Sequence, residues 1–226
     1  MANTPNQQEQ NAIDNIDMQL ASASERVAKN KKVIYWSLGI IIAIGACWCA
    51  WLWFYQTPRA NNSAAAYDQA MTKAMGGDSI AAAEFAAVAD KYSSTPAGNL
   101  AAMQAAQAYY RLGDYNKVVN YLGKFSTDEE VMDAQSYVLL GDAYVNLKKY
   151  DEALKAFDTA VKKGAGNDQI VPVVLWKEAN IYDAQKKYQD ALNCYEQIKT
   201  AFPNYVFGNG LTPDAYINRE KARLGK

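Results

Sequence analysis

The chain has 226 residues, and its 23 Lys and Arg residues against 24 Asp and Glu residues give a formal net charge of −1. This balance argues against a nucleic-acid-binding protein, which normally carries a basic field. The absence of histidine excludes a Ser–His–Asp triad, His-ligated zinc and a histidine general base. The sequence also has no Gly-rich phosphate loop and no metal-ligand spacing. We therefore expect a protein that is not an enzyme, with no cofactor, no metal and no small-molecule substrate.

Residues 1 to about 24 are rich in Asn, Gln, Ser and small residues, a composition typical of a flexible tail. The helical spacing of Ile13, Ile16 and Leu20 leaves open a short amphipathic contact. We interpret residues 1–32 as a flexible tail.

Residues 33–55 are predicted to span a membrane, since no charge occurs between Lys32 and Arg59. At ~1.5 Å per residue this helix is about 34 Å long, enough to cross a hydrocarbon core of ~30 Å. Five aromatic residues crowd its C-terminal end, where rings favour the membrane interface. A cleaved signal peptide, and lipidation at Cys47, are the alternatives. They fit less well, because the apolar run is longer than a signal's ~7–15 residues and stays apolar after Cys47.

Basic residues flank the two ends of this helix unequally, with Arg26, Lys29, Lys31 and Lys32 before it and only Arg59 closely after it. The positive-inside rule then places the N-terminus in the cytoplasm and exports the rest, which in a bacterial inner membrane is a periplasmic domain. One stripe of the helix has small residues that would let another membrane helix approach closely. The stripe consists of Gly39, Ala43, Ala46 and Ala50. The alternative is that Gly and Ala are simply common in membrane-spanning helices and that the stripe has no packing role.

Three later segments align with one another, starting at Ala101, Ser136 and Val174. Each has a small residue, a Tyr three positions later, a turn, a second Tyr, and then a pair of residues four apart on a second helix. We expect these side chains to pack one helix against the next. The predicted packing residues are Ala106, Tyr109, Gly141, Tyr144, Ala153, Phe157, Ala179, Tyr182, Ala191 and Tyr195.

This pattern resembles the tetratricopeptide repeat, which has a period of 34 residues. The runs Leu-Gly-Asp-Ala-Tyr at 140–144 and Tyr-Asp-Glu-Ala-Leu at 150–154 match it closely. A degenerate unit precedes them, with helices predicted at 64–75 and 80–92 after a linker at 56–63. A last helix is predicted to start with Thr212 as N-cap and Pro213 at its first position, presenting Arg219, Lys221 and Arg223 to water. The expected fold is all-α: a transmembrane helix, then a repeat domain (64–226) of three to four helical hairpins plus a C-terminal capping helix.

Stacked hairpins of this kind form a superhelix whose concave face is lined by the first helix of each pair. Positions on those helices outside the packing pattern are candidates for protein binding. They mix apolar, amide and acidic groups, and an aromatic side chain with adaptable polar neighbours is typical of a binding face. The candidates are Met103, Gln107, Tyr110, Val138, Asp142, Asn146, Trp176, Asn180 and Asp183.

The order of tail, span, spacer and divergent repeats resembles the YfgM-like family of single-span inner-membrane tetratricopeptide proteins. The run Tyr92-Ser93-Ser94-Thr95-Pro96 before an Ala-rich helix is also similar. The resemblance implies association with the Sec translocon, periplasmic chaperones or exported proteins. We therefore expect a membrane-anchored protein-binding module that assists exported proteins or chaperones. The alternative is a scaffold or assembly factor of a cell-envelope complex.

Overall fold

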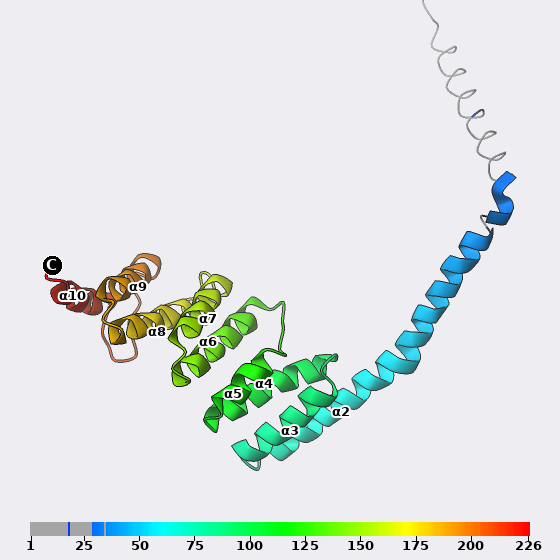
Figure 1. Cartoon of the computed structure of the whole chain (residues 1–226), viewed down its shortest axis with the longest axis horizontal. Helices are drawn as coiled ribbons and strands as arrows, with labels where there is room; N and C mark the ends of the chain where they lie inside the picture. The colour runs from blue at the N-terminus through cyan, green and yellow to red at the C-terminus, as the bar shows by residue number, and fades with distance from the viewer. Residues whose placement is uncertain (1–17, 19–28, 34) are drawn as a thin grey trace, which may run out of the picture. The chain divides into compact units, whose positions relative to one another are not determined.

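The computed structural model describes residues 18, 29–33 and 35–226 (Figure 1). It divides into two compact units, residues 1–58 and 59–226. Most of the predicted tail, including Ile13, Ile16 and Leu20, lies outside the described residues.

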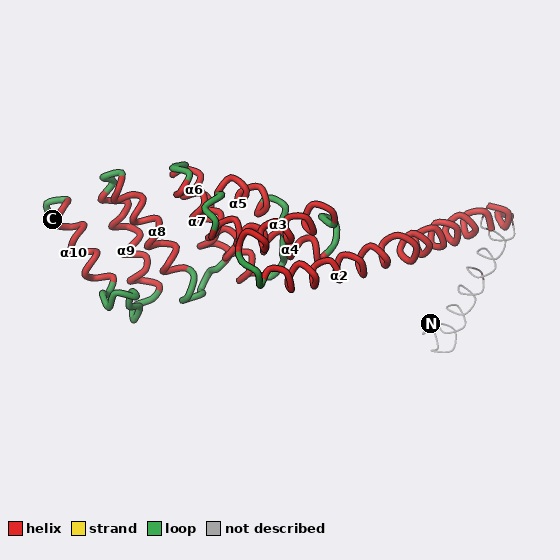
Figure 2. The backbone as a smooth tube through the Cα atoms, turned by 90° about the horizontal axis from the view of Figure 1, so that it is seen from below, coloured by secondary structure: helices red, strands yellow, loops and turns green. Residues whose placement is uncertain are grey.

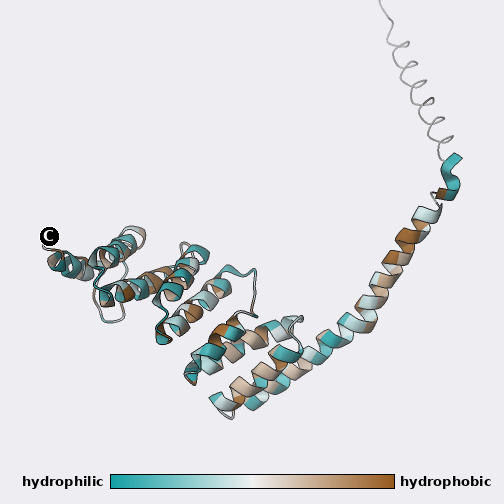
Figure 3. Cartoon of the chain, in the orientation of Figure 1, coloured by the Kyte–Doolittle hydropathy of each residue, from teal (hydrophilic) through white to brown (hydrophobic). Residues whose placement is uncertain are grey.

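The first unit contains the apolar helix expected at 33–55, which is coloured brown in Figure 3. Residues 35–51 are α-helical, and a π-helical segment, η1 (Leu52–Gln56), follows them. The Thr57 hydroxyl donates to the Leu52 carbonyl over 3.0 Å at its end. In the described part of the chain, one helix, Lys29–Ala74, is long and apolar enough to cross a membrane by length and composition. No part of its most apolar stretch is buried by other segments.

The described residues of the second unit form helices and loops and no strand (Figure 2). Four helix pairs follow one another along the chain, and a single helix closes the stack. This confirms the all-α, tetratricopeptide-like fold. The elements are α2 (Thr57–Ala74), α3 (Asp78–Lys91), α4 (Pro96–Arg111), α5 (Tyr115–Leu122), α6 (Glu130–Asn146), α7 (Tyr150–Lys163), α8 (Val171–Ala184), α9 (Tyr188–Ala201) and α10 (Pro213–Arg223).

The first pair, α2 and α3, corresponds to the degenerate unit. The rings of Tyr67 and Phe85 pack with centroids 5.6 Å apart, and the Lys73 ammonium lies 3.0 Å from the Glu84 carboxylate. However, residues 57–63, expected as a linker, are helical and belong to α2. The apolar helix continues through this segment without a break, and the Arg59 guanidinium donates to the Lys91 carbonyl at the end of α3 over 3.0 Å. Helix ends leave such carbonyls without an intrahelical partner.

Most of the side chains with the predicted packing pattern lie inside the stack. Phe157 and Tyr195 are fully buried, whereas the first-helix tyrosines are half-buried. At Gly141 an added Cβ would lie 2.4 Å from the Phe157 ring, so only glycine allows this ring to approach α6. Other positions with the pattern that are fully buried are Ala106, Ala153, Ala179 and Ala191.

The turn inside three of the pairs has a residue with positive φ at the same repeat position. It is Gly113 (φ 77°) in the second pair, but Lys148 (φ 59°) and Lys186 (φ 59°) in the third and fourth. This left-handed conformation suits glycine and costs other L-residues roughly 1–2 kcal/mol. Two equivalent turns of the domain are therefore strained.

Replacing Lys148 or Lys186 with Gly should raise the free energy of unfolding by about 0.5–1 kcal/mol each, because relief of strain exceeds the entropy that glycine adds to the unfolded chain. Thermal unfolding followed by circular dichroism of the full chain in mild detergent measures this. The matched control is Lys155→Gly, at an exposed position inside α7, which should instead lower the free energy of unfolding by about 1 kcal/mol. Equal losses at 148 and 155 would contradict the strain at the turn.

The last helix starts as predicted, with Thr212 as N-cap and Pro213 in its first turn. Its two arginines keep 38 % of their side-chain surface exposed, as expected, but they also pair with largely buried carboxylates, which the sequence did not predict. The Arg219 Nε donates to the Glu220 carboxylate over 2.7 Å, and Arg223 lies 3.3 Å from the same group. Both arginines also pair with Asp183 on α8. The reason is packing: Glu220 is completely buried, and such a charge needs partners.

Candidate protein-binding site

We call the surface shared by α4, α6 and α8 the first-helix face. Between α6 and α8 it has an apolar pocket of about 250 Å³, the α6–α8 pocket. A second one of about 310 Å³, the aromatic pocket, lies between α8, the loop 202–212 and α10. Val173 lines both, so the two pockets adjoin each other, and we call the pair of them the groove. The α6–α8 pocket is lined by Gln135, Val138, Leu139, Asp142, Gln169, Ile170, Val173 and Val174, and the aromatic pocket by Val173, Trp176, Tyr205, Phe207, Gly208, Asn209 and Tyr216.

The aromatic pocket is built by rings that hold one another in place. Phe207 is almost fully buried, and its ring centroid lies 4.9 Å from that of Tyr216, 5.1 Å from Tyr205 and 6.4 Å from Trp176. The Asn209 amide donates to the Tyr216 hydroxyl over 2.8 Å, which fixes the loop over α10. The pocket is therefore preformed by a loop that is packed against the last helix.

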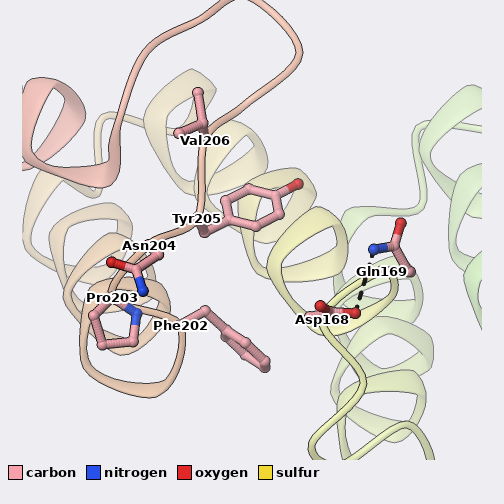
Figure 4. A pocket seen from close by; sticks show the side chains of 7 residues that line it. All are labelled: Asp168, Gln169, Phe202, Pro203, Asn204, Tyr205 and Val206. Atoms are coloured by element: carbon pink, nitrogen blue, oxygen red, sulfur yellow. Dashed lines mark hydrogen bonds between the residues drawn. The ribbon is translucent and has the colours of Figure 1, made fainter.

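A more polar hollow of about 510 Å³ adjoins the groove where α9 ends (Figure 4). The side chains of Tyr205 and Phe202 lie on one side of it, and those of Asp168 and Gln169 on the other. The Gln169 amide donates to the Asp168 carboxylate over 3.3 Å. Since Gln169 also lines the α6–α8 pocket and Tyr205 the aromatic pocket, this hollow adjoins both of them.

The charges beside the groove are paired with each other. The Lys177 ammonium donates to the Asp142 carboxylate over 2.6 Å, and both side chains are largely shielded from solvent. The Asn146 amide donates to the backbone carbonyl of Asp142 over 2.8 Å. Burial, and secondarily the charge of Asp142, raises the pKa of the Tyr110 hydroxyl on neighbouring α4. Tyr110 thus stays neutral at physiological pH and provides a hydrogen-bonding group rather than a charge.

The structure brings some of the predicted face residues together and separates others. Val138 and Asp142 line the α6–α8 pocket, Trp176 lines the aromatic pocket, and Tyr110 and Asn146 lie beside Asp142. Met103 is buried in the core at 7 % exposure, and Asp183 is held by α10. Gln107 and Asn180 are half-buried. The binding role of this set stays a prediction.

Several groove residues were not among the sequence candidates. On α8, Val173 and Lys177 are four positions apart, with Trp176 between them in the sequence. Residues three or four apart share one face of a helix, so this spacing could have indicated that the three side chains lie together. Tyr205 and Phe207 had no such signal, because the loop 202–212 has no periodicity.

The predicted helix-packing stripe of the apolar helix is exposed over its whole length, at Gly39, Ala43, Ala46 and Ala50. No side chain or backbone of another segment lies within 4 Å of a Cβ built at Gly39. Its role in packing against a second membrane helix also stays a prediction.

Comparison with known structures supports the fold. Two crystal structures of MamA are similar, with 19 % identity over 70 % of this chain and 84 % of that one (TM-score 0.54), and 18 % identity over 74 % and 83 % (TM-score 0.55). A chain in the crystal structure of the APC/C hetero-tetramer Cut9-Hcn1 is 16 % identical over 70 % of this chain and 29 % of its own (TM-score 0.50). No curated protein matches the sequence significantly. The family described as tetratricopeptide repeat-like domain, which includes the YfgM-type proteins, matches residues 27–204. The chain therefore belongs to the tetratricopeptide repeat-like domain family.

Proposed function

We propose that this protein is a single-span membrane protein whose repeat domain binds polypeptide segments in the groove on the first-helix face. The observation that carries the proposal is the pair of apolar pockets that adjoin at Val173. Each is large enough to hold a large apolar side chain, and burying one such side chain stabilises a complex by about 1.5–3 kcal/mol. Tetratricopeptide repeats are commonly protein-binding modules, and Trp and Tyr are enriched where binding energy concentrates.

The chemistry of the groove favours uncharged apolar segments. Its acidic and basic side chains, Asp142 and Lys177, neutralise one another. A charged ligand would gain no free partner there, whereas exposed apolar residues of an incompletely folded protein would gain burial.

We place the domain at a membrane through the apolar helix, with the N-terminus in the cytoplasm. The length and composition of that helix and the basic residues before it support this. In a bacterium the groove would then face the periplasm. Together with the resemblance to YfgM-like proteins, this makes exported proteins or their chaperones at the Sec translocon the proposed partners.

A photoreactive amino acid at Val173 tests the proposal in native membranes. We expect protein crosslinks from this position and few from Lys155, an exposed control site on α7. In the same assay Trp176→Ala should weaken crosslinking through loss of about 2 kcal/mol of binding free energy, roughly 30-fold in affinity.

The pattern of crosslinks separates the two candidate functions. Many products that differ in mass support binding to exported clients. One stoichiometric product supports a scaffold of a cell-envelope complex. If Val173 crosslinks no more protein than Lys155 does, the groove is not the binding site.

A further inference from the structure

The second helix of the second pair is shorter than its equivalents. α5 has 8 residues, whereas α3, α7 and α9 each have 14. It ends before Gly123, and residues 123–129 continue as a loop. Asn99 holds this loop on α4, because its amide donates to the Ser126 carbonyl over 2.7 Å and its side-chain oxygen accepts from the Ser126 backbone N–H over 2.9 Å. The side of α6 next to α5 therefore lacks the cover that a full-length helix would give it.

A pocket of about 340 Å³ lies between α5, the start of this loop and α6, and we call it the α5–α6 pocket. Leu122, Phe125 and Leu140 contribute apolar side chains to its lining, and Tyr137 and Tyr144 contribute rings that carry a hydroxyl group. Ligand pockets start at about this volume. The α5–α6 pocket is therefore large enough to bury a large apolar side chain of a partner.

The α5–α6 pocket lies on the opposite side of α6 from the groove. It is lined on α6 by residues that include Asp133, Tyr137 and Tyr144, whereas Gln135 and Asp142 line the groove. Since an α-helix has ~3.6 residues per turn, the first three positions fall on one side of α6 and the other two on the far side. A ligand of the α5–α6 pocket would therefore leave the groove free.

Unpaired carboxylates extend this side of α6 beyond the pocket. Glu129 and Glu130 lie about one helical turn before Asp133, and Asp128 precedes them in the loop. All three side chains are exposed. In the described part of the chain no Lys or Arg forms an ion pair with them, and Lys163 pairs with Asp133 at 2.7 Å instead. The acidic residues favour the start of α6, and they also leave negative charge beside an apolar pocket.

We propose that the α5–α6 pocket is a second docking site, which binds a basic amphipathic helix of a partner protein. One large apolar side chain of that helix enters the pocket, and Lys or Arg residues one turn away meet the carboxylates of Asp128, Glu129 and Glu130. A helix presents an anchor and a cation at this spacing of three or four residues. The bound helix takes the place of the turns that α5 lacks. The inference goes beyond the proposed function and does not depend on it, because the two sites lie on different sides of α6.

A designed peptide tests the inference on the full chain in nanodiscs of a zwitterionic lipid, which does not itself attract a basic peptide. The probe is an alanine-based helix of about 15 residues. It carries one Leu, a Lys four positions before and after that Leu, and a fluorescent label for anisotropy. We expect saturable binding that weakens at least about tenfold when Leu is replaced by Ala or both Lys residues by Glu. Binding should also weaken as salt is raised from about 50 to about 300 mM.

Charge reversal at the edge of the pocket tests the same contact from the side of the protein. Glu129→Lys combined with Glu130→Lys should lower the affinity for the peptide at least about tenfold. The matched control is Asp151→Lys combined with Glu152→Lys, since both residues are exposed in the first turn of α7. It makes the same change of charge at a helix start and should leave the affinity unchanged.

Two further variants separate this site from the groove. Val119→Trp places a larger side chain in the lining of the α5–α6 pocket and should abolish binding of the peptide. Trp176→Ala, in the groove, should leave it unchanged. The proposal is overturned if the peptide does not bind saturably, if it binds equally well without Leu, or if both charge reversals weaken it alike. Loss of binding in Trp176→Ala would place the peptide in the groove and would also overturn it.

Discussion

Replacing Arg219 and Arg223 together with Met should lower the free energy of unfolding by about 3–5 kcal/mol. The substitutions leave the completely buried Glu220 carboxylate without a cation, and removing the partners of a buried charge is strongly destabilising. They also release Asp183, so α10 loses its ionic contact with α8. Chemical unfolding of the full chain in detergent, followed by circular dichroism, measures the loss.

A third substitution distinguishes charge from packing. Adding Glu220→Met to the double variant should recover much of the stability, because it removes the orphaned charge and fills the site with an apolar side chain. Lys221→Met is the matched control, since Lys221 forms only an exposed pair with Glu196 at 3.5 Å and should change stability by less than about 1 kcal/mol. A triple variant no more stable than the double would show that Glu220 contributes by packing alone.

Gly141→Ala should destabilise the protein by about 2 kcal/mol, although alanine is the better helix former by about 1 kcal/mol. The new Cβ would lie 2.4 Å from the ring of Phe157, which is fully buried. The second helix pair combines Ala106 with Leu122 at the corresponding positions. Combining Gly141→Ala with Phe157→Leu therefore recreates a combination already present in this fold.

Thermal unfolding of the two single variants and the double variant forms a double-mutant cycle for this contact. We expect a favourable coupling of at least about 1 kcal/mol, because each substitution relieves the defect made by the other. Gly208→Ala is the control, since nothing lies within 4 Å of a Cβ built there, and it should be nearly neutral. Additive effects in the cycle would mean that Gly141 is not needed for the approach of the ring.

The repeat architecture could be predicted because its signal is local and recurs. Gly141 and Phe157, for example, belong to a pattern with counterparts in the neighbouring units. The continuation of the apolar helix into α2 could not be predicted in this way. The contact between Arg59 and the end of α3 joins segments thirty-two residues apart, and helical propensity alone does not show such a contact.

The candidate site was less predictable. Residue spacing along one helix shows which side chains share a face of that helix, but it does not show which other segments of the chain pack over that face. Asp183 was correctly assigned to a first helix, yet α10 returns to it with two arginines. The outer wall of the aromatic pocket comes from an aperiodic loop through Phe207.

The arrangement of helices in pairs has a consequence for how the chain acquires its structure. Each pair is made of segments adjacent in sequence, so its formation closes only a short loop, and proteins dominated by such contacts fold rapidly. The pairs can therefore form one after another, beginning with α2 and α3, as the polypeptide emerges in the N-to-C direction. Among these helices α10 is synthesised last. Until it is present, the ring of Tyr195 lacks its stacking partner Tyr216, and the carboxylate of Asp183 lacks its partner Arg219.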